Sequence, residues 1–126
     1  MYTFRKKERL CSQRIIGELY KSDNKLIVFP ISVHWIVRDG CDNDAPMQVL
    51  IVAPKKKLPH AVDRNRAKRL MRESYRLHKG ELTERLKASN KSIALGFNYI
   101  HTDVLSFSQI EKRVVKVFDE LIKELS

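Results

Sequence analysis

Residues 61–77 have the sequence AVDRNRAKRLMRESYRL, and this stretch sets the organisation that we predict for the chain. Its apolar residues recur at the spacing of an α-helix, so a helix is predicted over residues 61–78. Apolar strands are predicted on either side of it, over residues 47–53 and 92–99. A helix between two strands indicates a mixed fold, in which helices pack against a sheet.

The part of the chain before these elements is predicted to contain a helix and a further strand. Residues 10–20 carry an apolar stripe at helical spacing. Residues 26–38 alternate apolar and polar side chains, which is typical of a strand. Turn-forming residues follow at 39–46, so we expect the strand 26–38 to form a hairpin with the strand 47–53.

The second half is predicted to end in a long amphipathic helix over residues 106–125. A capping box can start this helix in two ways, as Ser106 with Gln109 or as Ser108 with Glu111. The helix 61–78 is expected to continue past Gly80 as a second segment. The predicted order is helix, strand, strand, helix, strand, helix, which indicates an α+β fold: a two-layer α/β sandwich with helices packed on a small central sheet.

Length and composition limit the class of protein. The 126 residues fit a single domain, 1–126, with a basic N-terminal arm at 1–9 and no internal repeat or linker. No apolar run reaches the length of a membrane span, and no secretory signal is recognised. Cys11 and Cys41 are too few for a disulfide framework or a zinc site. We therefore expect free thiols, a cytoplasmic location and no membrane partner.

The positive charge is concentrated in one segment. The formal net charge is +10, and residues 55–80 hold ten basic and only two acidic side chains. Such a field of one sign usually has a polyanionic partner, and phosphate backbones are the obvious one. Arginine predominates over lysine in the helix, and its planar guanidinium suits phosphate oxygens and base edges. The segment lacks the Trp and Phe residues with which a membrane-surface helix inserts.

A helical projection of residues 61–77 separates an apolar face from a basic one. The face predicted to meet the core consists of Ala67, Leu70, Met71, Ser74 and Leu77. The basic face consists of Asn65, Lys68, Arg69, Arg72 and Arg76, with Arg64 and Tyr75 at its edge and Arg66 on the far flank. Charged helix faces are often only solvated, but here the acidic partners of a solvated face are missing. The projection therefore favours binding of a nucleic acid.

The string VDRNRAKRLMRE at residues 62–73 resembles the RNR motif of the bacterial ribonuclease P protein subunit. Supporting similarities are an opening Phe4…Arg9-Leu10, a lysine-rich loop before Ala61, and the final helix that follows Leu105. The resemblance extends over nearly the whole chain.

The resemblance implies an α/β sandwich with a central sheet and a left-handed βαβ crossover, similar to domains of elongation factor G and some ribosomal proteins. It implies a subunit of a ribonucleoprotein endoribonuclease that binds the catalytic RNA and the single-stranded 5′ leader of precursor tRNA, and so promotes removal of the leader. The RNA carries out the reaction with Mg²⁺, which it mainly binds itself, and the protein supplies no catalytic residues. We expect a monomeric protein in a 1:1 complex with the RNA.

The resemblance also implies roles for individual residues. Those expected at the leader cleft are Arg64, Asn65, Lys68, Arg72, Tyr20, Ile16, and either His34 or Trp35. Those expected to contact the catalytic RNA are Arg66, Arg69, Lys55, Lys56 and Lys57. The family usually has an aromatic residue where this chain has Ile16, so half of the expected aromatic wall is replaced. Tyr20 and Trp35 could equally be core aromatics.

Two other functions fit parts of the pattern. One is a non-catalytic RNA-binding module of the ribosomal or RNA-chaperone type. The other is a DNA-binding regulator, which the strand and loop ahead of the basic helix disfavour, because a companion helix is expected there. The four histidines are scattered over different elements with no metal-ligand spacing, so neither a metal site nor catalysis by the protein itself is predicted.

Overall fold

The computed structural model describes residues 10, 12–40 and 46–125. The predicted arm at 1–9 and both cysteines lie outside these described residues. The elements in chain order are α1 (Gln13–Lys21), β1 (Lys25–Val28), β2 (Ile31–Asp39), β3 (Met47–Val52), α2 (Ala61–His78), α3 (Gly80–Ala88), β4 (Lys91–Tyr99) and α4 (Phe107–Leu125). The predicted α+β class and the continuation of the long helix as a second segment, α3, are confirmed.

The four strands form one sheet in the order β1-β2-β4-β3. The predicted hairpin between 26–38 and 47–53 is wrong, because β4 lies between β2 and β3 and is antiparallel to β2 and parallel to β3. The hairpin that does form joins β1 and β2, which divide the predicted strand 26–38 at the Phe29-Pro30 turn. Proline has no N–H with which to continue a strand ladder, so the chain turns there.

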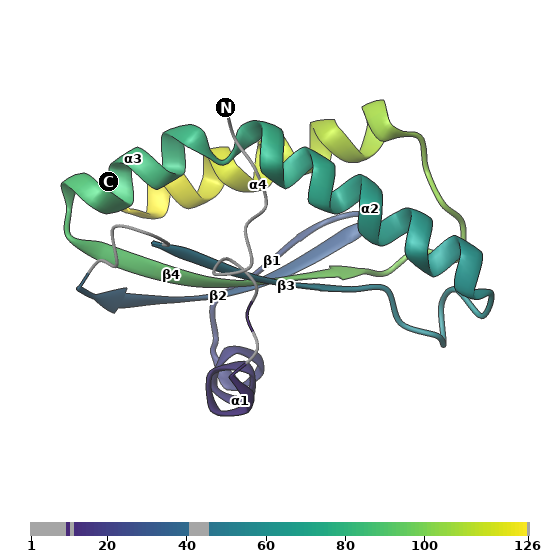
Figure 1. Cartoon of the computed structure of the whole chain (residues 1–126), viewed down its shortest axis with the longest axis horizontal. Helices are drawn as coiled ribbons and strands as arrows, with labels where there is room; N and C mark the ends of the chain where they lie inside the picture. Colours follow the sequence, from purple (N-terminus) through teal and green to yellow (C-terminus); the bar gives the residue numbers. More distant parts are fainter. Residues whose placement is uncertain (1–9, 11, 41–45, 126) are drawn as a thin grey trace.

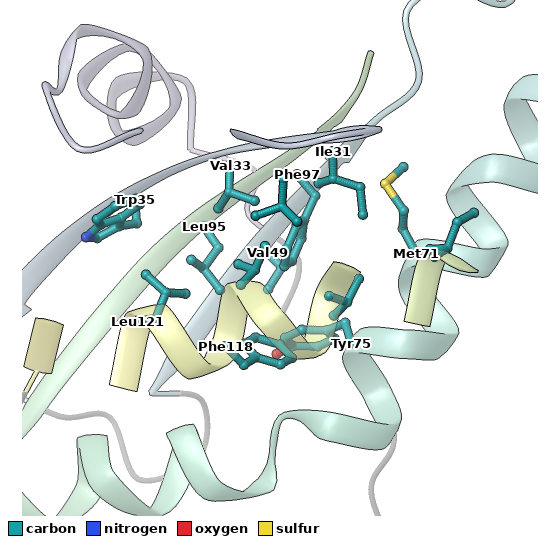
Figure 2. Packing of buried hydrophobic residues seen from close by; sticks show 14 of the residues in the cluster. Ile31, Val33, Trp35, Val49, Met71, Tyr75, Leu95, Phe97, Phe118 and Leu121 are labelled. Atoms are coloured by element: carbon teal, nitrogen blue, oxygen red, sulfur yellow. The ribbon is translucent and has the colours of Figure 1, made fainter. Parts of the chain in front are cut away.

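The connection from β3 to β4 crosses over through α2 and α3 and forms the βαβ unit that the resemblance implies. Figure 1 shows α2, α3 and α4 on one face of the sheet and α1 on the other. The face under α2 and α4 carries the main core, to which the strands contribute alternate residues such as Val33, Trp35, Leu95 and Phe97 (Figure 2). Within the described residues, none of the helices combines the length and apolar composition of a membrane span.

The core face of α2 differs from the predicted one. Tyr75 is fully buried. The centroid of its ring lies 6.1 Å from the ring centroid of Phe118 in α4 and 6.5 Å from that of Phe97 in β4. Leu77, predicted to be core, is 41% exposed. The projection of an isolated helix cannot show on which side a neighbouring helix packs, and Phe118 of α4 lies on the Tyr75 side (Figure 2).

Capping side chains start two of the helices. Ser12 accepts a hydrogen bond from the backbone N–H of Ile15 at the start of α1. At the start of α4, Ser106 accepts from the N–H of Gln109, and the Gln109 side chain accepts from the N–H of Ser106. Of the two capping boxes that the sequence allows, the structure therefore contains Ser106 with Gln109.

Gly96 in β4 allows α1 to lie close to the sheet. A Cβ atom at this position would come within 2.9 Å of Leu19 Cδ2, and Leu19 is fully buried. Leu19 belongs to a small second cluster with Leu10 and Ala94, against which Ile16 packs. The position of α1 therefore depends on the absence of a side chain at residue 96.

Replacing Gly96 by Val tests this dependence. We expect the free energy of unfolding to fall by about 1–3 kcal/mol, because the added methyl groups must displace Leu19. Gly17→Ala is the matched control, since a Cβ at Gly17 of α1 meets nothing within 4 Å and alanine favours the helix. Chemical denaturation measures both variants. A Gly96→Val protein as stable as Gly17→Ala would contradict the close approach.

Tyr99 holds the connection between β4 and α4. Its buried hydroxyl donates a hydrogen bond to the carbonyl oxygen of Asp103 (2.6 Å) and accepts one from the N–H of Leu105 (3.0 Å). Burial raises the pKa of Tyr99, although the hydrogen bond from the Leu105 N–H acts in the opposite direction. The fold therefore stabilises the neutral phenol.

Replacing Tyr99 by Phe removes both hydrogen bonds and keeps the ring, so the free energy of unfolding should fall by about 1–3 kcal/mol at neutral pH. Because the folded pKa is raised, the contribution of Tyr99 is complete below the pKa of an unfolded tyrosine, near pH 10, and is lost as the pH rises through the folded pKa. Denaturation should show a smaller difference in the free energy of unfolding between the wild-type protein and Tyr99→Phe at strongly alkaline pH than at neutral pH. A difference independent of pH would contradict this role of the hydroxyl.

Candidate nucleic-acid interface

Two separate surfaces carry the residues that the sequence singled out. The first, which we call the basic surface, covers the loop after β3 and the outer side of α2. Its exposed members are Lys55, Lys56, Lys57, Asn65, Arg66, Arg69 and Arg72, and its half-buried members are Arg64 and Lys68. Loop and helix together therefore present cationic side chains and one amide, a combination that suits phosphate groups and base edges.

Arg64 has a structural role within this surface. Its Nη1 donates hydrogen bonds to the carbonyl oxygens of Leu58 (3.0 Å) and Pro59 (2.8 Å). Leu58 is almost completely buried, so the end of the loop is fixed to the core while the three lysines before it are exposed. Part of the hydrogen-bonding capacity of Arg64 is therefore used to hold the lysine loop against the start of α2.

The charge of the basic surface is strongest toward the start of α2. Near the end of the helix, the Arg76 guanidinium is paired with the Glu73 carboxylate. The hydrogen bond from Arg76 lowers the pKa of Glu73 and raises that of Arg76, and desolvation opposes both shifts. The helix dipole adds positive potential at the end where Lys55–Lys57 lie, and Asp63 is the one acidic residue of the first turn.

The second surface, which we call the aromatic site, lies where α1 meets the opposite face of the sheet. It consists of Tyr20, His34 and Asn98. The rings of Tyr20 and His34 have centroids 4.9 Å apart, and the Tyr20 hydroxyl donates a 2.9 Å hydrogen bond to Asn98 Oδ1. Tyr20 is 42% exposed. Within the described residues, His34 Nδ1 and Asn98 Nδ2 are buried atoms without a hydrogen-bond partner.

The surroundings of His34 lower its pKa and so favour the neutral imidazole. Partial burial lowers its pKa, and the nearby positive charge of Lys25 lowers it further. Lys25 is exposed and pairs with His34 in the β1–β2 register, so its ammonium group supplies a positive charge beside the aromatic site. The site thus combines an exposed phenol ring, a neutral imidazole, an amide and a nearby cation.

The two alternatives in β2 lie on opposite faces of the sheet. His34 lies on the α1 face of the sheet, whereas Trp35 is 9% exposed and belongs to the main core on the other face, near Leu121 (Figure 2). Trp35 is therefore corrected from a cleft residue to a core residue, because neighbouring residues of a strand point to opposite faces. Ile16 is half-buried and packs on the small cluster around Leu19 beneath α1, so it helps to hold this helix against the sheet.

The two surfaces lie on different faces but are connected around one end of the sheet. Val52, the last residue of β3, pairs with Asn98 of the aromatic site. From Val52 the chain continues directly into the lysine loop and then into α2. The predicted leader-cleft residues of α2 do not share a face with Tyr20, because α2 and α1 lie on opposite faces of the sheet (Figure 1).

Asn98 is a site residue that the sequence reasoning missed. It is flanked by Phe97 and Tyr99, which are both fully buried in the main core. Strict alternation along the strand 92–99 places Asn98 on the opposite face from them. A polar residue at this position of an apolar strand was the signal that could have identified it.

The histidines and acidic residues that the structure describes are not arranged as metal ligands. Among the described residues, no three His, Cys, Asp or Glu side chains form a group that could hold a metal ion. His78 lies 3.0 Å from Glu111 and links α2 to α4, while His34 belongs to the aromatic site. The basic surface consists of cationic donors and so does not fit Mg²⁺, which prefers oxygen ligands.

Comparison with known proteins places this geometry in a family. The family model described as Ribonuclease P matches residues 4–121. A ribonuclease P protein component of Porphyromonas gingivalis is 30% identical over 112 residues, covering 88% of this chain and 80% of the relative. One of Chlorobium phaeobacteroides is 39% identical over 82 residues, covering 64% of this chain and 56% of the relative.

Solved structures agree on the fold. A structure of the Staphylococcus aureus RNase P protein superposes with a TM-score of 0.64 at 19% identity, covering 90% of this chain and 94% of that one. A mutant of the same protein gives a TM-score of 0.67 at 17% identity, with 92% and 89% covered. With the family match over nearly the whole chain, the conclusion is that this chain belongs to the ribonuclease P protein family, the protein components of an RNA–protein endoribonuclease.

Proposed function

We propose that this chain binds the ribonuclease P RNA through the basic surface and the single-stranded 5′ leader of precursor tRNA through the aromatic site. In this way it promotes the endonucleolytic 5′ maturation of tRNA. The observation that carries the leader-binding part is the exposed Tyr20 ring next to His34 and Asn98, whose buried Nδ1 and Nδ2 atoms have no partner within the described residues. Aromatic faces bind unpaired bases with little dependence on sequence.

The basic surface suits a structured RNA rather than a single strand. Arg66 and Arg69 are exposed on α2, and three consecutive exposed lysines precede the helix. These cations are spread over a loop and about one turn of α2, which matches phosphates distributed over a folded RNA. Arg64 keeps the loop in place, so the surface is organised before any RNA binds.

The leader then runs from the aromatic site toward the lysine loop at the same end of the sheet. Arg64, Asn65, Lys68 and Arg72 at the start and middle of α2 lie beyond this loop and remain the proposed contacts for the part of the precursor nearest the catalytic RNA. The RNA supplies the reaction together with the Mg²⁺ that it binds. The protein acts in the cytoplasm as a monomer in a 1:1 complex with the RNA.

A cleavage assay tests this function. The protein is combined with a bacterial ribonuclease P RNA and a precursor tRNA at a Mg²⁺ concentration that limits the RNA alone. We expect leader removal to be faster with protein than without it. RNA binding without any stimulation, with the RNA of the same organism, would contradict the proposal and fit a general RNA-binding module.

The aromatic site makes a prediction about leader affinity. Tyr20→Ala removes the stacking ring and should weaken binding of precursor tRNA by about tenfold, while leaving the affinity for mature tRNA unchanged. Tyr20→Phe keeps the ring and loses only the hydrogen bond to Asn98, so it should retain most of the affinity. Fluorescence titration of the RNA–protein complex with both tRNAs measures this. Equal losses for precursor and mature tRNA with Tyr20→Ala would argue against a leader site.

The basic surface makes a prediction about salt. Each phosphate contact that is lost should make the slope of log affinity against log salt less steep by about 0.7–0.9. The Arg66→Ala/Arg69→Ala variant should therefore bind the ribonuclease P RNA with a slope less steep by about 1–2. The matched control is Arg113→Ala/Lys116→Ala, which removes the same charge from exposed positions of α4. Identical slopes for the two double variants would show that total charge, not the basic surface, governs binding.

A further inference from the structure

A second aromatic pair, with one exposed and one half-buried ring, lies at the end of the sheet that carries Asn98. Phe29 occupies the turn between β1 and β2, and His101 follows the end of β4. Their ring centroids are 4.9 Å apart, and Phe29 is 54% exposed. The N–H of Ile100 donates a 2.8 Å hydrogen bond to the carbonyl oxygen of Pro30, which holds the two segments together.

This pair is close to the aromatic site. Asn98 precedes His101 by three residues, a distance of about 10 Å along an extended chain. Across the sheet, Asn98 pairs with Ser32 and Ser32 pairs with Ile27, so Ile27 lies on the same row and the same face as Asn98. Ile27 is 56% exposed, and α1 packs mainly against β2 and β4.

Within the part of the chain that the structure describes, Phe29 and Ile27 are two of the exposed large apolar side chains, and Phe29 does not belong to either hydrophobic cluster. Exposed apolar patches of this kind usually mark interaction sites. The surroundings favour RNA as the occupant. The patch continues the aromatic site, and the exposed Lys25, which pairs with His34 in the β1–β2 register, can neutralise a phosphate beside that site.

We propose that Phe29 and His101 form a second base-stacking site, which binds another unpaired nucleotide of the RNA strand held at Tyr20. Ile27 forms an apolar floor between the two sites. This inference rests on the leader-binding role proposed above, and it assigns to this chain a longer single-stranded footprint than the aromatic site alone provides. The chemical class of the ligand is an unpaired nucleobase, since every base has a face that can stack on an aromatic ring.

The test is a series of precursor tRNAs whose leaders increase in length one nucleotide at a time. Each is titrated against the complex of protein with ribonuclease P RNA. Phe29→Ala and the wild-type protein should bind the shortest leaders equally, and beyond a certain length the variant should bind about tenfold more weakly. Phe29→Tyr keeps a stacking face and should bind the longer leaders as tightly as the wild-type protein does. Leu77→Ala is the matched control, since it removes another exposed apolar side chain, from α2.

The outcomes separate this inference from the function on which it rests. If Tyr20→Ala weakens leader binding and Phe29→Ala has no effect at any length, the second site is wrong and the leader site stands. If neither variant affects leader binding, the proposed leader site fails as well. A loss with Phe29→Ala that is equal for all leaders and for mature tRNA, or a change of oligomeric state measured by sedimentation, would overturn stacking on the leader. Thermal unfolding confirms that each variant is folded.

Discussion

Strand β4 forms hydrogen bonds with neighbours on both of its edges and is covered on both of its faces. It is antiparallel to β2 and parallel to β3, so the chain must leave β3, cross over the sheet and return between two strands that are already in place. The crossover consists of α2 and α3 (Figure 1). The basic helix α2 is part of the connection that brings β4 to the centre of the sheet. It therefore lies outside the sheet, with one side exposed at the surface.

The two faces of β4 explain why the protein has two distinct surfaces. On one face, Phe97 and Tyr99 pack into the core under α2 and α4. On the other, Gly96 leaves room for Leu19, and Asn98 accepts the hydrogen bond from Tyr20. A single strand thus positions α1 and the aromatic site on one side and supports the basic surface on the other. Because the two surfaces are on opposite faces, they can bind two different parts of an RNA substrate complex.

Local patterns in the sequence were sufficient for features that depend on neighbouring residues. The helical repeat predicted α2 and α4, and the local spacing predicted two possible capping boxes, of which Ser106 with Gln109 forms. Pairing between strands depends on segments far apart in sequence, so nothing in 26–53 could show that β4 would separate β2 from β3. The same limit explains Tyr75, whose burial depends on Phe118 of α4.

The sequence was likewise sufficient for only part of the candidate site. The composition of residues 55–80 located the basic surface, because charge is a property of the local sequence. That Arg64 holds the lysine loop depends on the path of the chain through Leu58 and Pro59, which a helical projection does not contain. Which of His34 and Trp35 faces α1 can be read only from the pairing of β2 with its neighbours. The role of Asn98 becomes visible only once α1 is placed against the same face of the sheet.

In the proposed function, the α1 face of the sheet and the outer side of α2 bind two different RNAs. Photo-crosslinking of the assembled complex tests this division between the two surfaces. A photoreactive uridine is placed first in the leader and then in the ribonuclease P RNA, and the linked peptides are identified by mass spectrometry. The leader should link to the peptides that contain Tyr20 and His34, and the ribonuclease P RNA to those that contain Arg66 and Arg69. Leader crosslinks confined to the outer side of α2, with none on the α1 face, would contradict the account.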